Sequence, residues 1–311
     1  MKAIIINQYG SAEQLTEAEV DQPKLTDDQV LVDMHATSIN PIDWKLREGY
    51  LQEMLPFDFP IILGWDAAGV VKETGAKVTD FQVGDRVFAR PSTTRFGTYA
   101  EYAAIDEQLL AKIPDNITFE EAAAVPLAGL TAWQCLVDFS EIKPGDKVLI
   151  HAGSGGVGSF AIQIAKSLGA FVASTASGKN EEFLQKIGVD RFINYKEEDF
   201  EEAIEDYDIV LDTLGGDIQQ KSFNVLKKGG KLVSVVGAPD ENIAKEKGIK
   251  AGSLWLDPNG RQLAELAGLM EKGELIATVG HTFPFSAEGL KEAHRLSETH
   301  HARGKIVIKI K

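Results

Sequence analysis

The pattern of apolar and polar positions changes near residue 120. Before it, short apolar runs rich in β-forming residues alternate with glycine-containing turns, which is typical of an antiparallel barrel or sandwich. Val78, Phe81 and Val83 followed by Gly84-Asp85 predict a tight turn that leads into a strand. The predicted strands are Ala3 to Ile6, Gln29 to Met34, Ala67 to Glu73, Asp85 to Ala89 and Tyr99 to Ile105.

After Pro126 the pattern becomes strand, helix, strand, helix. Five apolar strands separated by helices predict a doubly wound, mainly parallel sheet, so the chain belongs to the α/β class. A further amphipathic helix is predicted over Arg261 to Met270. The alternating tail Lys305 to Ile310 predicts a strand that returns to the first module. The five strands are Lys147 to Ala152, Ala170 to Thr175, Arg191 to Tyr195, Asp208 to Leu211 and Lys231 to Val236.

Composition narrows the class of protein. A chain of 311 residues has the length of about two domains. Its net charge of −15 disfavours a nucleic-acid or anionic-membrane binder, because both require a basic surface. No stretch has about 18 unbroken apolar residues, and the start does not read as a signal peptide. The single cysteine, Cys135, excludes an internal disulfide and a zinc site of several thiolates. We expect a soluble, cytoplasmic protein.

A glycine-rich loop follows the first strand of the second module. Gly153, Gly155 and Gly158 fit the pattern G-x-G-x-x-G between an apolar strand and a helix. In such a loop the first glycine makes the turn, the second lets a pyrophosphate approach the backbone, and the third lets helix and strand pack closely. The strand and helix stand where this mechanism requires them, so the loop predicts a dinucleotide site.

The end of the second strand distinguishes NAD from NADP. NAD-binding versions place an acid there, about 20 residues after the loop, to bind the ribose 2′-hydroxyl. This chain has Ser177 and Lys179 and no acid before Glu181. A hydroxyl and a lysine suit a 2′-phosphate, so we expect NADP(H), although Lys179 could also be an ordinary surface lysine.

The sequence resembles the medium-chain dehydrogenase/reductase superfamily, in its zinc-independent quinone oxidoreductase (zeta-crystallin-like) branch. The resemblance implies a GroES-like β-rich catalytic domain over residues 1–121 and 258–311. It also implies a Rossmann NADP(H)-binding domain with a doubly wound parallel sheet over residues 122–257. The similar stretches are SINPIDWKLREG, LGWDAAGVV, GAKVTDFQVGDRVFA, GTYAEYAAI, AAAVPLAGLTAW, the glycine loop, VLDTLGG and RGKIVIKI.

The resemblance also bears on metal binding. Zinc-dependent relatives carry a cysteine near Asn40 and a histidine in a Gly-His-Glu motif, where this chain has Gly64-Trp65-Asp66. The six histidines show no convincing metal-binding spacing either. We therefore expect no metal site.

The activity implied is zinc-independent hydride transfer from NADPH to a quinone or another α,β-unsaturated carbonyl compound. Such acceptors spread the incoming charge through conjugation, so positioning and a few hydrogen bonds suffice. Asn40 and Tyr50 are the candidate catalytic residues, the first to orient the acceptor or the carboxamide and the second to donate a proton. Asn40 could instead cap a turn and Tyr50 could be ordinary packing, and Asp43 is expected to be structural. Alternatives are an enoyl-thioester or specific enone reductase, or a non-catalytic NADPH-binding protein.

Cofactor contacts are implied at positions that match the family. Lys305 could reach the cofactor or be a surface lysine. Trp255 could lie at the rim of the cleft or in a dimer contact, or it could pack in the core. Relatives commonly pair through edge strands, so a homodimer is expected, with the strand after Trp255 as a candidate edge. The implied cofactor-binding residues are Thr131, Ser154, Gly155, Gly156, Val157, Ser177, Lys179, Tyr195, Leu214, Gly237 and Lys305.

Overall fold

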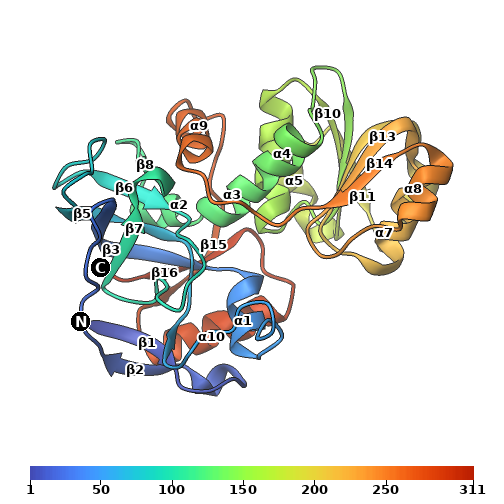
Figure 1. The fold of residues 1–311 in the computed structure, drawn as a ribbon. Coiled ribbons are helices and arrows are strands. Elements are labelled where there is room, and N and C mark those ends of the chain that lie inside the picture. The colour runs from blue at the N-terminus through green and yellow to red at the C-terminus, as the bar shows by residue number, and fades with distance from the viewer. The chain divides into compact units, whose positions relative to one another are not determined.

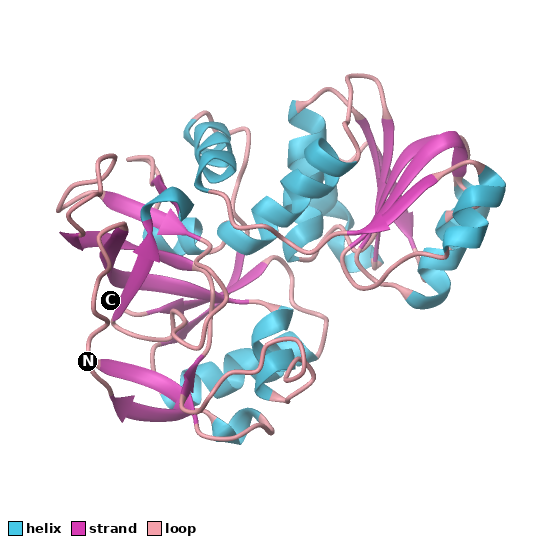
Figure 2. Cartoon of the chain, viewed as in Figure 1, coloured by secondary structure: helices cyan, strands magenta, loops and turns pink.

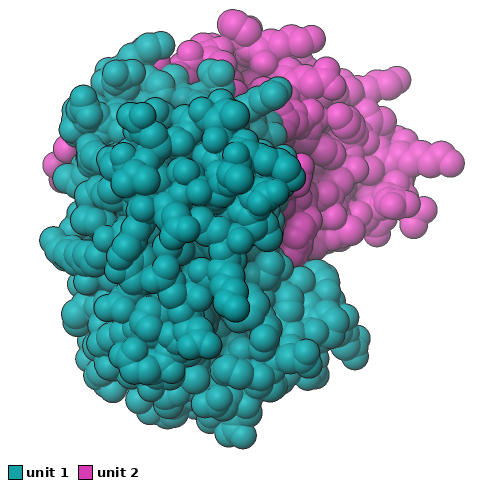
Figure 3. Space-filling view, turned by 60° about the vertical axis from the view of Figure 1, so that its left-hand side comes forward, with its two compact units in different colours: residues 1–127, 258–273, 277–311 teal, residues 128–257, 274–276 magenta.

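The computed structural model describes residues 1–311 and divides into two compact units (Figure 3). The sequence placed the first boundary after residue 121, and the units divide after Leu127; the boundary before Pro258 is the same in both. No helix is long and apolar enough to cross a membrane. Unit 1 comprises Met1–Leu127, Pro258–Gly273 and Ala277–Lys311, and unit 2 comprises Ala128–Asp257 and Glu274–Ile276.

Unit 1 is built on a seven-stranded, mostly antiparallel sheet (Figures 1 and 2). The C-terminal strand pairs with β3, with Ile306 opposite Ile39, so the tail returns to the first module as the sequence predicted. The sheet order is β15 (Val279–Pro284), β16 (Lys305–Lys309), β3 (Gln29–Ile39), β5 (Ala67–Thr74), β6 (Arg86–Ala89) and β8 (Leu110–Lys112), with β7 (Tyr102–Asp106) paired to β3. A second sheet contains β2 (Thr16–Glu19), β1 (Lys2–Ile6) and β4 (Ile61–Ile62).

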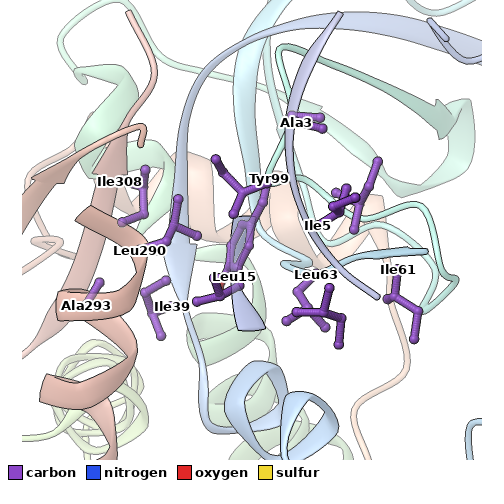
Figure 4. Close-up of a cluster of buried hydrophobic side chains, with 14 of the residues drawn as sticks. Ala3, Ile5, Leu15, Ile39, Ile61, Leu63, Tyr99, Leu290, Ala293 and Ile308 are labelled. Carbon is purple, nitrogen blue, oxygen red and sulfur yellow. The ribbon is translucent and has the colours of Figure 1, made fainter. Parts of the chain in front are cut away.

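A hydrophobic core joins the small sheet of unit 1 to its large one (Figure 4). Ile39 from β3 and Ile308 from β16 pack in one cluster with Leu290 and with Tyr99, which is fully buried. The helices of unit 1 are α1 (Pro41–Arg47), α2 (Phe119–Ala123), α9 (Gly260–Glu271) and α10 (Ala287–Glu298), with short 3₁₀ turns η1 (Ala12–Gln14) and η2 (Glu107–Leu109).

Unit 2 is a six-stranded parallel sheet with the order expected of a doubly wound fold. Its strands are β11 (Arg191–Asn194), β10 (Phe171–Ala176), β9 (Lys147–Ile150), β12 (Tyr207–Asp212), β13 (Leu226–Ser234) and β14 (Lys250–Ser253). Its helical segments are η3 (Gln134–Phe139), α4 (Gly156–Ser167), η4 (Gly178–Asn180), α5 (Glu181–Lys186), α6 (Phe200–Ala203), α7 (Gly216–Ser222) and α8 (Glu241–Lys247), while α3 (Pro126–Trp133) spans the boundary between the units.

Several elements differ from the sequence prediction. The edge strand lies before Trp255, not after it, because β14 forms the end of the sheet and the following segment has no regular structure. The sequence of β14, KAGS, has no apolar run, so periodicity could not reveal it. Trp255 is 59% exposed, which rules out core packing. The strand predicted from Tyr99 begins only at Tyr102, and β15, α8 and α10 were not predicted.

Candidate active site

The three glycines of the loop after β9 have different surroundings. A Cβ on Gly153 would lie 2.0 Å from Ser174 Oγ, and one on Gly158 would lie 2.5 Å from Ala152 O, so both glycines are required for packing. A Cβ on Gly155 would meet only Ala152 O, at 3.3 Å. Gly155 is the N-cap of the twelve-residue helix α4, so open space faces a helix N-terminus, where backbone N–H groups favour an anion.

Hydrogen bonds of Asn180, a residue that no sequence pattern indicated, link the segment after β10 to this loop. The side-chain amide of Asn180 donates to Ser154 Oγ at 3.1 Å and to Ser177 Oγ at 3.3 Å. This asparagine therefore ties the glycine loop to the predicted 2′-phosphate segment, which also carries the exposed Lys179. In sequence it reads as a turn residue, and no pattern distinguishes it.

Three further candidates follow other strands of the parallel sheet. Tyr195 comes directly after β11, Leu214 after β12 and Gly237 after β13, so they share the edge of the sheet with the glycine loop. Asp212 holds the turn at Leu214, because one carboxylate oxygen accepts 2.9 Å hydrogen bonds from the backbone of Leu214 and Gly215. Gly237 has nothing within 4 Å of its Cβ position.

This edge of unit 2 fits a dinucleotide. Gly155 and Gly237 both leave room for a group to approach the backbone, as binding of a pyrophosphate requires. Gly156 and Val157 form the first turn of α4, where the backbone N–H groups of a helix favour an anion. Thr131 is buried and lies on α3, a helix that precedes the first strand of the parallel sheet in the chain.

A second group of polar residues is buried in unit 1 around Asp66. One of its carboxylate oxygens accepts from Leu127 N at 2.8 Å. The other accepts from Ser38 Oγ at 2.5 Å and from Asn40 Nδ2 at 2.7 Å, and lies 3.5 Å from Lys305 Nζ. Four donors therefore surround a carboxylate that has no exposure to solvent. A buried charge requires such a set of partners.

Lys305 is buried and faces this group. Its ammonium donates to Ile39 O at 3.0 Å and to Asn40 Oδ1, besides its contact with Asp66. The surface location considered from the sequence is therefore wrong. A direct contact with a cofactor would require Lys305 to give up one of these partners, since an ammonium has three donors.

Asn40 stands at the centre of the group as the N-cap of α1. Its Nδ2 donates to Asp66 and its Oδ1 accepts from Lys305, while its backbone N–H donates to Asp43 Oδ2 at 2.7 Å. Asn40 is thus held in one orientation, and Asp43 has the structural role expected of it. Each end of the Asn40 amide retains capacity for one further hydrogen bond.

Asp43 belongs to a buried chain of hydrogen bonds that crosses unit 1. Arg47 Nη1 lies 3.0 Å from His294 Nδ1, His294 Nε2 lies 3.0 Å from Tyr99 OH, and Tyr99 donates to Asp43 Oδ2 at 3.1 Å. Arginine can only donate, so His294 is neutral with its proton on Nε2. Burial lowers the pKa of His294 to about 3 and raises that of Asp43 to about 7.

Tyr50 lies in the turn after α1 and is 72% exposed. Its ring meets the ring of Trp44 edge to face, with centroids 6.4 Å apart. This is not core packing, and the phenol is accessible. The two candidate catalytic residues thus differ in their surroundings: the amide of Asn40 is buried and fixed, and the hydroxyl of Tyr50 is exposed.

Among the 311 residues, no three or more His, Cys, Asp or Glu side chains are grouped so that they could hold a metal ion. Cys135 is buried, and burial raises the pKa of its thiol. His151 is also buried, between Thr175 and Ser222. These side chains serve the packing of the protein.

Comparison with known proteins places the chain in a family. The profile of the alcohol dehydrogenase GroES-like domain matches residues 26–115, and that of the zinc-binding dehydrogenase family matches residues 187–308. The NADPH-dependent alkenal/one oxidoreductase, chloroplastic, of Arabidopsis thaliana is 36% identical over 99% of this chain and 79% of its own.

Two solved structures share the whole fold. The quinone oxidoreductase from Coxiella burnetii is 37% identical, with a TM-score of 0.92 over 100% of this chain and 99% of its own. The Escherichia coli quinone oxidoreductase complexed with NADPH is 28% identical, with a TM-score of 0.87 over 100% of both chains. The chain belongs to the medium-chain dehydrogenase/reductase superfamily, in its quinone oxidoreductase branch.

Proposed function

We propose that the protein is an NADPH-dependent oxidoreductase that reduces quinones or other α,β-unsaturated carbonyl compounds. The observation that carries this proposal is the edge of the unit 2 sheet, where an open glycine loop at a helix N-terminus adjoins Ser177 and Lys179. A relative named an NADPH-dependent alkenal/one oxidoreductase and the NADPH complex of the Escherichia coli enzyme support the same cofactor and acceptors.

Each part of this edge has a role in holding NADP(H). The amides at Gly155, Gly156 and Val157 bind the pyrophosphate, and Ser154 is fixed beside them by Asn180. Ser177 and Lys179 bind the 2′-phosphate, which Lys179 neutralises as a point charge. The bound cofactor supplies the hydride, and the chain supplies position and electrostatics. The remaining cofactor contacts are proposed at Thr131, Tyr195, Leu214 and Gly237.

Asn40 and Tyr50 are the proposed acceptor-side residues. Asn40 is preoriented by Asp66 and Lys305, so its remaining N–H can hold a carbonyl oxygen without losing side-chain entropy on binding. Tyr50 donates a proton to the reduced acceptor from its accessible hydroxyl. Full turnover of Tyr50→Phe with both a quinone and an enone would refute the proton-donor role. Lys305 acts through Asn40 as a positioning residue.

We also propose that the reaction needs no zinc. The Asp66 carboxylate is already surrounded by four donors, and His151 and His294 are engaged by side chains, so these groups are not available as metal ligands. A quinone or enone acceptor delocalises the incoming charge, which lowers the demand for a Lewis acid. Activity that survives a chelator, with no stoichiometric zinc by metal analysis, is expected.

A homodimer and a cytoplasmic location complete the proposal. The edge strand β14 has a partner on one side only, so it is available for pairing with a second copy. The single buried thiol is compatible with a reducing compartment. Light scattering that gives the mass of one chain would contradict the dimer.

The test of the proposed function is the loss of NADPH absorbance with a panel of acceptors. We expect turnover with quinones and enones and little with simple ketones. Selective turnover of enoyl thioesters would favour the alternative reductase. Tight NADPH binding without turnover of any acceptor would favour a non-catalytic protein.

A further inference from the structure

Four neighbouring strands of the large sheet in unit 1 bring charged residues to one edge. The pairing of Ile306 with Ile39 puts Lys305 beside Asn40. The pairing of Ala67 with Ala89 puts Asp66 beside Arg90, which follows the end of β6. Lys305, Asn40 and Asp66 are linked by hydrogen bonds, as described above, and Arg90 is the remaining member of this edge.

Arg90 is only 3% exposed, yet few of its donors are used. Its Nη1 donates to the neighbouring Pro91 O, and its Nε is buried without any partner. The adjacent Asp66 is bonded to four other donors and not to Arg90. A buried donor without an acceptor is destabilising, so this guanidinium requires an explanation.

The other buried arginine of unit 1 shows what a structural role looks like. Arg47 has no exposure, and its Nε donates to Gly10 O at 3.0 Å. Its Nη1 contacts His294, and its Nη2 contacts Glu48 and Glu298. Two carboxylates therefore compensate Arg47, whereas no carboxylate is bonded to Arg90.

Arg90 has no bonded counter-charge at this edge. Asp66 is paired with Lys305, and burial lowers the pKa of both Lys305 and Arg90 more than the attraction of Asp66 raises it. Asp43 also lies within electrostatic reach of Arg90, but burial raises its pKa to about 7, so it is only partly ionised at neutral pH. An oxygen that carries negative charge would complete the group.

We propose that Arg90 binds the carbonyl oxygen of the electron acceptor and stabilises the negative charge that this oxygen gains during reduction. This inference rests on the proposed function and on the place of Asn40 at the same edge. A hydride forms a new C–H bond at the β-carbon of an enone, and the C=C pair shifts toward the carbonyl group, whose own pair moves onto oxygen. NADPH is oxidised to NADP⁺, and a proton then completes the product. A permanent cation beside that oxygen stabilises the negatively charged enolate more than the neutral enone.

Hydration of the orphaned atoms is the competing explanation. Asp43 Oδ1 is also buried without a partner, so a water between it and Arg90 Nε would satisfy both groups. In that case Arg90 would support the fold and have no preference for an oxyanion. Binding of a phenol, whose ionised form resembles the charged oxygen, separates these explanations.

The experiment uses the protein saturated with NADP⁺ and titrated with 4-nitrophenol at several pH values. Because phenolate has its own visible absorbance, the titration reports the pKa of the bound phenol without any turnover. We expect the wild-type protein to bind the ionised form preferentially, Arg90→Gln to lose this preference, and Arg90→Lys to keep part of it. Arg261→Gln, which removes an exposed arginine from α9, is the matched control and should behave as wild type.

Steady-state kinetics give the second readout. Arg90→Gln should lower kcat/KM for the acceptor on the order of 10²-fold with an unchanged KM for NADPH. Equal phenolate binding by wild type and Arg90→Gln, or no preference for phenolate in the wild type, overturns the proposal. Unchanged acceptor kinetics in Arg90→Gln overturn it as well, and leave the proposed function intact. A wild-type protein without turnover refutes the proposed function, while the phenolate titration still decides the role of Arg90.

Discussion

The ammonium group of Lys305 lies 3.5 Å from the carboxylate of Asp66, and both side chains are buried. The two residues are 239 positions apart in the chain, and they meet because β16 and β5 both pair with β3. Together they hold both ends of the Asn40 amide. The C-terminal strand thereby fixes a candidate catalytic residue near the N-terminus.

Removing the ammonium group of Lys305 from its pair with Asp66 should strongly destabilise the folded protein. Lys305→Met leaves Asp66 charged and buried and leaves Asn40 Oδ1 without its donor, so we expect a loss of about 3 kcal/mol or more in the free energy of unfolding. Urea unfolding measures this loss. Lys309→Met is the control on the same strand: its partner is Glu120 and its side chain is half exposed, so the loss should stay below about 1 kcal/mol. Equal losses would contradict the role of Lys305.

Two glycines of the loop should respond differently to the same substitution. Gly153→Ala places a Cβ against Ser174 Oγ and should lower the melting temperature. Gly155→Ala meets only one atom, at 3.3 Å, so the fold should be nearly as stable while the affinity for NADPH falls at least about tenfold, because the Cβ fills the space for the pyrophosphate. Thermal unfolding measures the stability of both variants, and calorimetric titration measures their affinity for NADPH. Unchanged NADPH affinity in Gly155→Ala would show that the cofactor does not use this loop.

Lys179 should discriminate between the two cofactors. Lys179→Ala removes a charge-assisted contact with the 2′-phosphate, which predicts roughly tenfold to hundredfold weaker NADPH binding and unchanged NADH binding. Lys186→Ala removes an exposed lysine from the end of α5 and should change neither affinity. A parallel loss of NADPH and NADH affinity in Lys179→Ala would instead indicate damage to the loop.

Buried histidines should make the protein sensitive to acid. Burial lowers the pKa of His294 to about 3 and that of His151 to about 4, both below the unfolded value of 6.5. The unfolded chain therefore binds protons first, and the stability that these groups contribute above pH 6.5 is lost as the pH falls toward those values. His294→Gln should reduce this loss by a few kcal/mol in urea unfolding across that range. An unchanged pH dependence would show that the pKa of His294 is the same in the native and the unfolded state.

Asp43 should change the pH dependence of stability in the direction opposite to that of the buried histidines. Its pKa is raised from 3.8 to about 7, so its contribution to stability is present at low pH and is lost as the pH rises through that range. Asp43→Asn keeps an acceptor for Asn40 and Tyr99 and should remove this part of the pH dependence. The two substitutions therefore change the slope of stability against pH with opposite signs.

The parallel sheet and its glycine loop were predictable because their signals are local. Strand ends in a parallel sheet meet at one edge, so the predicted strands together with the family resemblance put Ser177, Tyr195 and Gly237 at that edge. The group around Asp66 could not be predicted, because its hydrogen bonds join residues from strand pairings that no short pattern specifies. Arg90 likewise reads in sequence as a charged residue before a proline, and only the burial of its Nε without a partner distinguishes it.

Transfer of the label from deuterated NADPH tests the proposed activity most directly. With NADPH deuterated at C4, as both the 4R and the 4S forms, and an enone as acceptor, the proposed function predicts one deuterium at the β-carbon of the saturated product from one form and none from the other. Mass spectrometry and NMR of the product give the answer. NADPH that is consumed without deuterium in the product, or not consumed with any quinone or enone, would contradict it.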